Sequence, residues 1–154
     1  MYLLTTNYSL PTTNLKDMPD RFSKEVRSRI MSRIRSRNTG LEQVIFRLLR
    51  LRGIPFRRHY RGALGTPDVA RPARRLALFI DGDFWHGYRY PSWRRTLPTK
   101  FWRDKIERNR RRDRRNFSTL RRRGWSVLRV WEHELKKRPV ETAAKIVAFL
   151  RQTR

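Results

Sequence analysis

The segment RLALFIDGDFWHG, Arg75 to Gly87, joins an apolar run to a concentration of acidic and aromatic side chains. Its first part, residues 75–84, is rich in Leu, Phe and Ile, which predicts a buried β-strand. The preceding RPAR, residues 71–74, predicts a hairpin loop, with another strand beginning at Asp68 on its far side. The hairpin therefore brings Asp68 approximately opposite the acidic end of the longer strand.

The rest of the chain predicts helices and strands that pack around this hairpin. Helical periodicity predicts a basic helix at 23–37, an amphipathic helix at 41–53, a long helix at 101–123 and a last helix that begins at Pro139. Further strands are predicted at 54–61 and 125–131, and residues 88–99 are predicted to be irregular. This order indicates an α/β fold with a small mixed β-sheet flanked by helices. Residues 21–154 are predicted to form a single domain, preceded by a flexible tail at 1–20.

The charge of the chain points to a polyanionic partner. Its 39 Lys and Arg against 13 Asp and Glu give a formal net charge of +26 over 154 residues. Such an excess repels itself unless a polyanion neutralises it, which favours a nucleic acid. No apolar stretch approaches the roughly 18 residues of a membrane-spanning helix. The chain has no cysteine, which excludes disulfides and thiolate metal sites and is compatible with a reducing cytoplasm.

Three carboxylates and one histidine form the candidate catalytic group. Asp81 and Asp83 are two residues apart on the predicted strand, so they are expected to share a face, with Asp68 opposite and His86 close by. Carboxylate oxygens are the ligands that Mg²⁺ prefers. A metal beside a phosphodiester polarises the phosphoryl oxygen, and a nearby base activates water.

Each of these residues also has a plainer interpretation. Asp68 after Pro67 is typical of a turn, and Asp81-Gly82-Asp83 is typical of a loop. A single histidine such as His86 is more often a surface or packing residue than a catalytic one. Glu42, three residues after Thr39, fits a capping box at a helix start. The conjunction of the three acids with His86 favours the metal site.

Aromatic and basic side chains beside the acids fit a duplex-DNA substrate. Phe84 and Trp85 would enter the base stack, where a mismatched step costs the least to unstack. The alternative is that one or both of them belong to the core. The arginines between 108 and 115, Arg112 among them, have few acids nearby and are predicted to contact phosphates.

In these residues the chain resembles the Vsr family of very-short-patch-repair DNA mismatch endonucleases. The resemblance runs from about Ser28 to Glu134 and rests on RSRIMSRIRSRNTGLE, the Pro67-Asp68 pair, DGDFWHG, FWRDKIERNRRRD and GWSVLRVWEHEL, in that order. It implies a restriction-endonuclease-like core of the PD-(D/E)xK type and hydrolysis of one DNA strand beside a T:G mismatch, with one or two Mg²⁺. It also implies a bacterial cytoplasmic protein that works at the nucleoid as a monomer, with mismatch-repair proteins as further partners.

The resemblance assigns roles to individual positions. Asp68 matches the central metal-binding aspartate, His86 the histidine that activates water, and Glu42 an active-site glutamate. The matches expected to contact DNA are Met31, Phe84, Trp85, Lys105 and Asn109, and Arg112 joins them because of its charge and not as a match. The catalytic set is therefore Asp68, His86, Glu42 and Asp81, and the metal set is Asp68, Asp81 and Asp83.

The chain departs from the best-known form of the family at two places. Ile80-Asp81 stands where that form has Thr-His, so the Asp81 charge must bind metal or be offset by an arginine. Asp83 stands in place of a cysteine. Residues Tyr88, Tyr90 and His133 occupy positions of zinc ligands, with Asp113 taken as the one retained, so this variant is expected to hold no structural zinc.

Two other functions compete with mismatch nicking. The first is a Vsr-like nuclease of homing or restriction type, directed to a particular intact sequence. The second is a non-catalytic, basic nucleic-acid-binding protein, which the charge fits well. Neutralising Asp68 discriminates between the classes, since it would abolish cleavage by a nuclease and leave simple binding intact.

Overall fold

The computed structural model describes residues 39–97 and 99–153. Its main elements are α2 (Gly40–Leu51), β1 (Arg57–Arg58), β2 (Val69–Arg71), β3 (Leu76–Asp81), α3 (Tyr90–Trp93), α4 (Lys100–Arg122), β4 (Ser126–Trp131), α5 (Glu132–Lys137) and α6 (Pro139–Arg151), with 3-10 turns η2 (Pro72–Arg74) and η3 (Arg94–Thr96). The predicted tail, the basic helix at 23–37 and Met31 lie outside the described residues. Within the described residues, no helix is long and apolar enough to cross a bilayer.

The four strands form one mixed sheet in the order β1-β2-β3-β4. β1, β2 and β3 are antiparallel neighbours, whereas β3 and β4 run parallel from Leu76 opposite Ser126 to Asp81 opposite Trp131. A parallel pair requires a long crossover, and α4 provides it. The small mixed sheet with flanking helices confirms the expected α/β class.

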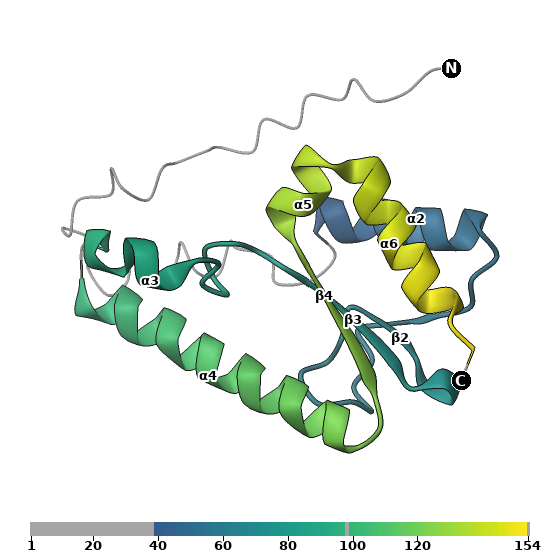
Figure 1. The fold of residues 1–154 in the computed structure, drawn as a ribbon, viewed down its shortest axis with the longest axis horizontal. Coiled ribbons are helices and arrows are strands. Elements are labelled where there is room, and N and C mark those ends of the chain that lie inside the picture. The colour runs from purple at the N-terminus through teal and green to yellow at the C-terminus, as the bar shows by residue number, and fades with distance from the viewer. Residues whose placement is uncertain (1–38, 98, 154) are drawn as a thin grey trace.

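Alternation along β3 divides the interior between the two faces of the sheet. Leu76 and Leu78 pack into the core formed with α2 and α6, whereas Ala77 and Phe79 pack with residues of α4. Figure 1 shows α4 on one side of the sheet and α2, α5 and α6 on the other. Asp81 has the same parity as Ala77 and Phe79 and therefore faces α4. This parity determines which residues surround its carboxylate.

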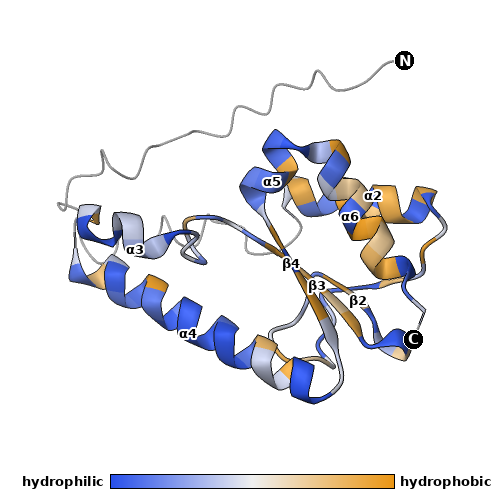
Figure 2. Cartoon of the chain, in the orientation of Figure 1, coloured by the Kyte–Doolittle hydropathy of each residue, from blue (hydrophilic) through white to orange (hydrophobic). Residues whose placement is uncertain are grey.

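The two best-predicted helices begin at side-chain caps. α2 begins at a capping box, in which the Thr39 side chain accepts from the Glu42 N–H and Glu42 accepts from the Thr39 N–H. α4 is capped by Thr99, whose hydroxyl accepts from the Trp102 N–H. Its buried face carries Trp102, Ile106, Asp113, Phe117 and Leu120, close to the predicted face. Figure 2 shows that most of the rest of α4 is hydrophilic.

Three predictions of local structure are wrong. β3 ends at Asp81 instead of Phe84, β1 covers only Arg57–Arg58, and the short helix α5 was not expected. The predicted last helix is present as α6, whose apolar buried face consists of Ile146, Val147 and Leu150, with Val140 80% exposed at its start. The early end of β3 matters most, because it removes Asp83 from the strand.

The chain leaves β3 in a tight turn that returns toward α4. The N–H of His86 donates to the Gly82 carbonyl and that of Tyr88 donates to the Asp83 carbonyl. Gly87 has a φ of +68°, a left-handed conformation that side chains other than glycine rarely adopt. A Cβ at Gly87 would lie 3.0 Å from Ile106 Cγ2 and closer still to Arg110 Cδ. The turn is therefore held tightly against the inner face of α4.

We expect Gly87→Ala to lower the free energy of unfolding by about 1–3 kcal/mol, since it combines a strained φ with crowding against α4. Chemical denaturation followed by circular dichroism measures the change. Gly40→Ala is the matched control, because Gly40 opens α2 with no atom within 4 Å of a new Cβ. It should be neutral or slightly stabilising. Equal stability of the two variants would contradict the account of the turn.

Candidate active site

Asp68 and Asp81 come together because β2 begins where β3 ends. The two strands are antiparallel, with Val69 opposite Leu78. One oxygen of Asp68, Oδ2, accepts a hydrogen bond of 2.7 Å from the N–H of Ile80. The expected placement of Asp68 beside the end of β3 is therefore what the structure shows. Two groups of possible metal ligands lie at these strand ends, one that includes Glu42 of α2 and one that includes Asp113 of α4.

The first group consists of Glu42, His59 and Asp68, which offer ligand atoms within 4.8 Å of one another. His59 Nε2 lies 3.4 Å from Glu42 Oε2, and its Nδ1 lies 3.7 Å from Asp68 Oδ1. Glu42 comes from α2, where its other oxygen completes the capping box, and only 2% of the residue is exposed. Two carboxylates and an imidazole are a donor set that fits a divalent cation.

The pKa of Asp68 shows that its environment disfavours the negative charge. Burial, with added contributions from the carboxylates of Glu42 and Asp81, raises this pKa from 3.8 to about 7. The hydrogen bond from Ile80 and the proximity of His86 act in the opposite direction without cancelling the shift. A cation at this position would relieve the unfavourable charge, so the electrostatics as well as the donor atoms fit a metal ion.

The second group consists of Asp81, His86 and Asp113. Asp113 Oδ2 lies 2.6 Å from His86 Nδ1, and Asp81 Oδ1 lies 3.4 Å from His86 Nε2. Burial raises the pKa of Asp113, but hydrogen bonds and charges from His86 and Arg112 outweigh it, so the net shift is downward. An ionised Asp113 holds the imidazole with Nδ1 as the donor, which leaves Nε2 as the nitrogen able to accept a proton.

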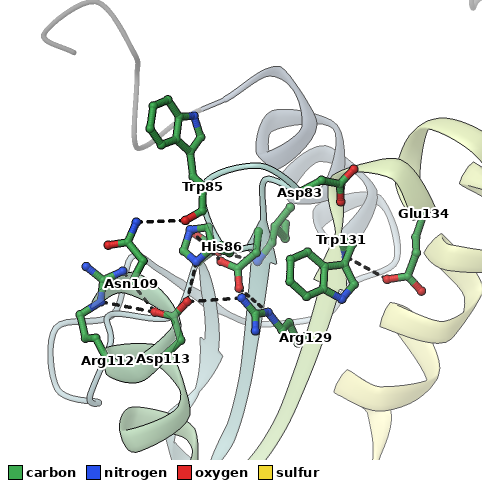
Figure 3. Close-up of polar contacts among 12 residues, drawn as sticks. Asp83, Trp85, His86, Asn109, Arg112, Asp113, Arg129, Trp131 and Glu134 are labelled. Atoms are coloured by element: carbon green, nitrogen blue, oxygen red, sulfur yellow. Dashed lines mark hydrogen bonds and ion pairs between the residues drawn. The ribbon is translucent and has the colours of Figure 1, made fainter. Parts of the chain in front are cut away.

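Arg129 of β4 supplies the positive charge for this second group (Figure 3). Its Nε lies 2.6 Å from Asp81 Oδ2 and its Nη2 lies 3.3 Å from Asp113 Oδ2. The Nε and Oδ2 atoms are buried and make no hydrogen bond of ordinary geometry, so this contact is an electrostatic pair. Burial nevertheless raises the pKa of Asp81 against the opposing effects of His86 and Arg129. Of the two alternatives for the Asp81 charge, the structure shows an offsetting arginine.

Comparison with known proteins now identifies the chain's relatives. A family model described as DNA mismatch endonuclease Vsr matches residues 19–92. The DNA mismatch endonuclease Vsr of Escherichia coli is 37% identical over 126 residues, which cover 79% of this chain and 78% of the relative. This chain belongs to the Vsr family of DNA endonucleases.

Other Vsr relatives carry a different description. The type II nicking enzyme V.XorIIP of Xanthomonas oryzae pv. oryzae is 42% identical over 123 residues, 77% of this chain and 88% of the relative. The type II nicking enzyme V.NmeDIP of Neisseria meningitidis is 32% identical over 129 residues, 82% of this chain and 87% of the relative. The similarity therefore covers most of this Vsr chain, including both ligand groups.

Asp83 is not part of either ligand group of this Vsr protein. Because β3 ends at Asp81, the expectation that Asp83 shares its face is wrong. The Asp83 carboxylate instead lies 2.7 Å from His133 Nδ1 of α5 and points away from His86 (Figure 3). The geometry gives Asp83 a partner on the opposite side of the turn from Asp113.

Two of the positions matched to Vsr zinc ligands, Tyr88 and His133, pack together. Tyr88 packs on His133 with ring centroids 4.3 Å apart and on Trp131 at 5.0 Å. The Asp83–His133 pair lies in the same cluster. Asp113, taken as the one retained zinc-ligand position, contacts His86 and Arg129. The turn after β3 is thus joined to α5 by an ion pair and aromatic contacts.

The two aromatic residues expected to contact DNA are both partly buried. Phe84 stacks on Trp93 at 5.5 Å with an interplanar angle of 21°. Trp85 packs on Trp102 at 5.7 Å, and Lys105 Nζ lies 5.5 Å from its ring centroid. Figure 3 shows the Trp85 side chain directed away from Asp113 and Arg129. Phe84 and Trp85 contact each other with ring centroids 5.0 Å apart, and both pack against the aromatic cluster beside α3 and α4.

The polar residues of α4 expected to contact DNA already have protein partners. The Asn109 side chain donates to the Trp85 carbonyl at 3.0 Å, so it holds the turn. Arg112 pairs with Asp113 at 3.1 Å while 52% of its side chain stays exposed. Burial, followed by the charge of Arg108, lowers the pKa of Lys105. Asn109 thus holds the turn after β3 in place, and Arg112 contacts Asp113 while much of its side chain stays in solvent.

Sequence reasoning missed His59 and Arg129, and it did not assign Asp113 a role beside His86. Arg129 sits on β4 opposite Phe79, on the face toward α4, and strand parity with Asp81 would have indicated it. His59 follows the short β1, and its N–H donates to the Asp68 carbonyl. Its nearness to Asp68 follows from the pairing of β1 with β2, which the sequence alone does not specify.

The pKa of Asp68 predicts the pH dependence of stability. Because the folded-state pKa exceeds that of the unfolded chain, the metal-free protein should lose stability as pH rises from about 4 to about 7. Asp68→Asn keeps an acceptor for the Ile80 N–H and removes the charge. With chelator at pH 8 it should raise the free energy of unfolding by about 1–3 kcal/mol, less than the full value of a three-unit pKa shift because the site is partly solvated.

Denaturant unfolding at pH 5 and pH 8 measures this effect. The advantage of the variant should be clearly smaller at pH 5 than at pH 8, because at pH 5 only part of the window from about pH 4 to about pH 7 has been crossed. A variant that is less stable than the wild type at both pH values would show that the Asp68 charge is well compensated in the metal-free protein.

Proposed function

We propose that this Vsr protein is a Mg²⁺-dependent endonuclease that nicks one DNA strand beside a T:G mismatch in very short patch mismatch repair. The observation that carries the proposal is the position of Asp68, a buried carboxylate with a raised pKa between two carboxylate–histidine groups. The family membership and the formal net charge of +26 support DNA as the substrate.

The residues that would hold the metal are Asp68 and Glu42. Both belong to the ligand group that also contains His59, and among the described residues no arginine lies within ion-pair distance of Asp68. Mg²⁺ bound there supplies charge to polarise the phosphoryl oxygen and stabilise the charge that develops on hydrolysis. The protein's part is to fix the two carboxylates, one through the cap of α2 and the other through the Ile80 N–H.

His86 is the proposed general base. Asp113 fixes its Nδ1, so Nε2 can take a proton from the attacking water, and Asp113 then stabilises the imidazolium. Arg129 keeps Asp81 and Asp113 from raising the negative charge around the scissile phosphate. In this proposal Asp81 orients and stabilises His86, because its carboxylate is already paired with Arg129.

The outer face of α4 and the turn after β3 form the proposed DNA surface. Arg114 and Arg115 are exposed, and no carboxylate of the described residues lies within ion-pair distance of either. They are suited to bind phosphates. Each neutralised phosphate would add about −0.9 to the slope of the logarithm of the binding constant against the logarithm of salt concentration. Trp85 lies in the turn and would stack beside the mismatch, where unstacking costs least.

Three further features belong to the proposal. The hairpin that carries Asp68 and the adjacent acidic strand end support a restriction-endonuclease-like core of the PD-(D/E)xK type. We propose one catalytic domain over residues 21–154 that acts on DNA as a monomer. The bacterial sources of the relatives support work on nucleoid DNA in the cytoplasm, where mismatch-repair proteins would be the next to act.

Strand cleavage on matched duplexes tests the function. Wild type should nick a duplex with one T:G pair in the presence of Mg²⁺, and neither a fully paired duplex nor a reaction with chelator should give product. Asp68→Ala and His86→Gln should lower the rate by at least about 10²-fold while DNA affinity is kept, because both residues act on the reaction and not on binding.

His133→Gln is the matched histidine control, since it lies outside both ligand groups, and should retain most of the activity. Binding without cleavage by the wild type in any metal would instead support the non-catalytic basic binding protein.

A sequence-directed nickase is the second candidate, favoured by relatives described as type II nicking enzymes. Placing the same T:G pair in several flanking sequences, each with a fully paired partner duplex, separates the two functions. Mismatch recognition predicts that the T:G pair raises the nicking rate in every context tested. A rate that follows the flanking sequence and is the same with T:A would establish the second candidate.

A further inference from the structure

We propose that Glu42, His59 and Asp68 form a mixed nitrogen and oxygen site that binds Mn²⁺ more tightly than Mg²⁺, with His59 as a direct ligand. The inference deepens the proposed nuclease function and rests on it for the use of the metal in cleavage. Binding of the metal itself is independent of that function. His59 lies in one of the two ligand groups and has no part in the mechanism given above.

The spacing of the three side chains matches ligands that share an ion. Two ligand atoms about 2.1 Å from one ion are roughly 3.0 to 3.5 Å apart in octahedral or tetrahedral geometry. His59 Nε2 lies 3.4 Å from Glu42 Oε2, and the other ring nitrogen, Nδ1, lies 3.7 Å from Asp68 Oδ1, both longer than an ordinary hydrogen bond of about 2.9 Å. Only one of the two nitrogens can bind a given ion, and one nitrogen of His59 with one oxygen each from Glu42 and Asp68 lie within 4.8 Å of one another.

The hairpin that places Asp68 also places His59. The His59 N–H donates to the Asp68 carbonyl at 3.1 Å, directly before β2. Its ring meets Phe46 edge to face at 5.8 Å, and only 16% of the side chain is exposed. The imidazole is thus held against the apolar side of α2, next to Glu42 of the same helix. Main chain and packing both fix its position before any ion arrives.

The other ligand group is less suited to a dication. Arg129 contacts both Asp81 and Asp113, and Arg112 contacts Asp113 as well. A divalent ion would meet two guanidinium charges there, and His86 Nδ1 already bonds to Asp113. The Asp68 carboxylate, in contrast, contacts the Ile80 N–H and His59, and among the described residues it lies within ion-pair distance of no arginine or lysine.

The donor types decide which ion is preferred. Mg²⁺ is hard and takes oxygen ligands, usually keeping several waters. An imidazole nitrogen suits the first-row transition metals, and Mn²⁺ also accepts carboxylates readily. A set of one imidazole and two carboxylates therefore favours Mn²⁺ over Mg²⁺, although Mg²⁺ can still use the two carboxylates. Mg²⁺ and the more tightly bound Mn²⁺ would thus compete for one site.

Two measurements on the full-length, DNA-free protein test the inference. Calorimetric titration should show one Mn²⁺ per chain, bound at least about 10-fold more tightly than Mg²⁺. Pulsed electron paramagnetic resonance of the bound Mn²⁺ should detect a directly coordinated ¹⁴N nucleus. The coupling to nitrogen distinguishes a ligand from a residue that merely positions Glu42 or Asp68.

The chain has three histidines, so the nitrogen can be assigned. His59→Gln should abolish the ¹⁴N coupling and weaken Mn²⁺ binding about 10-fold or more, with a smaller effect on Mg²⁺. His59→Asn is the second variant, because His59 has a φ of +44° and Asn tolerates that conformation. His86→Gln and His133→Gln are the matched controls and should keep the coupling, with folding of all variants checked by circular dichroism.

Several outcomes would overturn the inference. A ¹⁴N coupling lost in His86→Gln and kept in His59→Gln would place the ion at the other group. Absence of nitrogen coupling in the wild type, equal affinity for the two ions, or tighter Mn²⁺ binding by His59→Gln would remove His59 from the ligands. Mn²⁺ bound as expected by a protein that cuts no duplex would leave this site intact and reject the proposed nuclease function.

Discussion

The electrostatic cost of gathering carboxylates at one end of a small sheet is the constraint on which this structure depends. Glu42, Asp81 and Asp113 are each at least 94% buried, and Asp68 lies between them. Isolated buried charges of this kind are strongly unfavourable unless they are paired. The parallel pairing of β3 with β4 places Arg129 on the face where Asp81 and Asp113 meet, so its guanidinium offsets the charge of these two acids.

The charge on the Asp68 side of the cluster is left for a bound ligand to offset. Around Arg129, the carboxylates of Asp81 and Asp113 pair with the arginine and with His86, and these contacts can orient the imidazole as a proton acceptor. On the Asp68 side, burial and neighbouring acids keep the carboxyl poorly compensated, which favours a cation from solution. The cluster of acids is thus suited both to orient His86 and to bind a cation. The two parts differ because Arg129 contacts Asp81 and Asp113. The division follows from strand parity, which sends Asp81 toward α4.

Local patterns predicted what depends on neighbours in sequence. The hairpin at 71–74, the capping box before α2 and the inward face of α4 follow from spacing and cap residues, and so does the meeting of Asp68 with the end of β3. Spacing could not show that β3 stops at Asp81, because the turn that ends it is completed by a partner in α5. Arg129 and His59 were missed for the same reason. Their roles depend on which strands pair, and one-dimensional periodicity does not contain that information.

α4 carries two different surfaces on one rigid rod. Its inward residues, among them Asp113 and Asn109, hold the histidine and the turn, while its outward arginines face solvent. Since positions three and four apart share a face and the intervening ones do not, the two surfaces can change independently. If the outward arginines contact DNA as proposed, substitutions there would change which DNA is bound and leave the inward residues around His86 in place. Target choice and chemistry could then change separately on one helix.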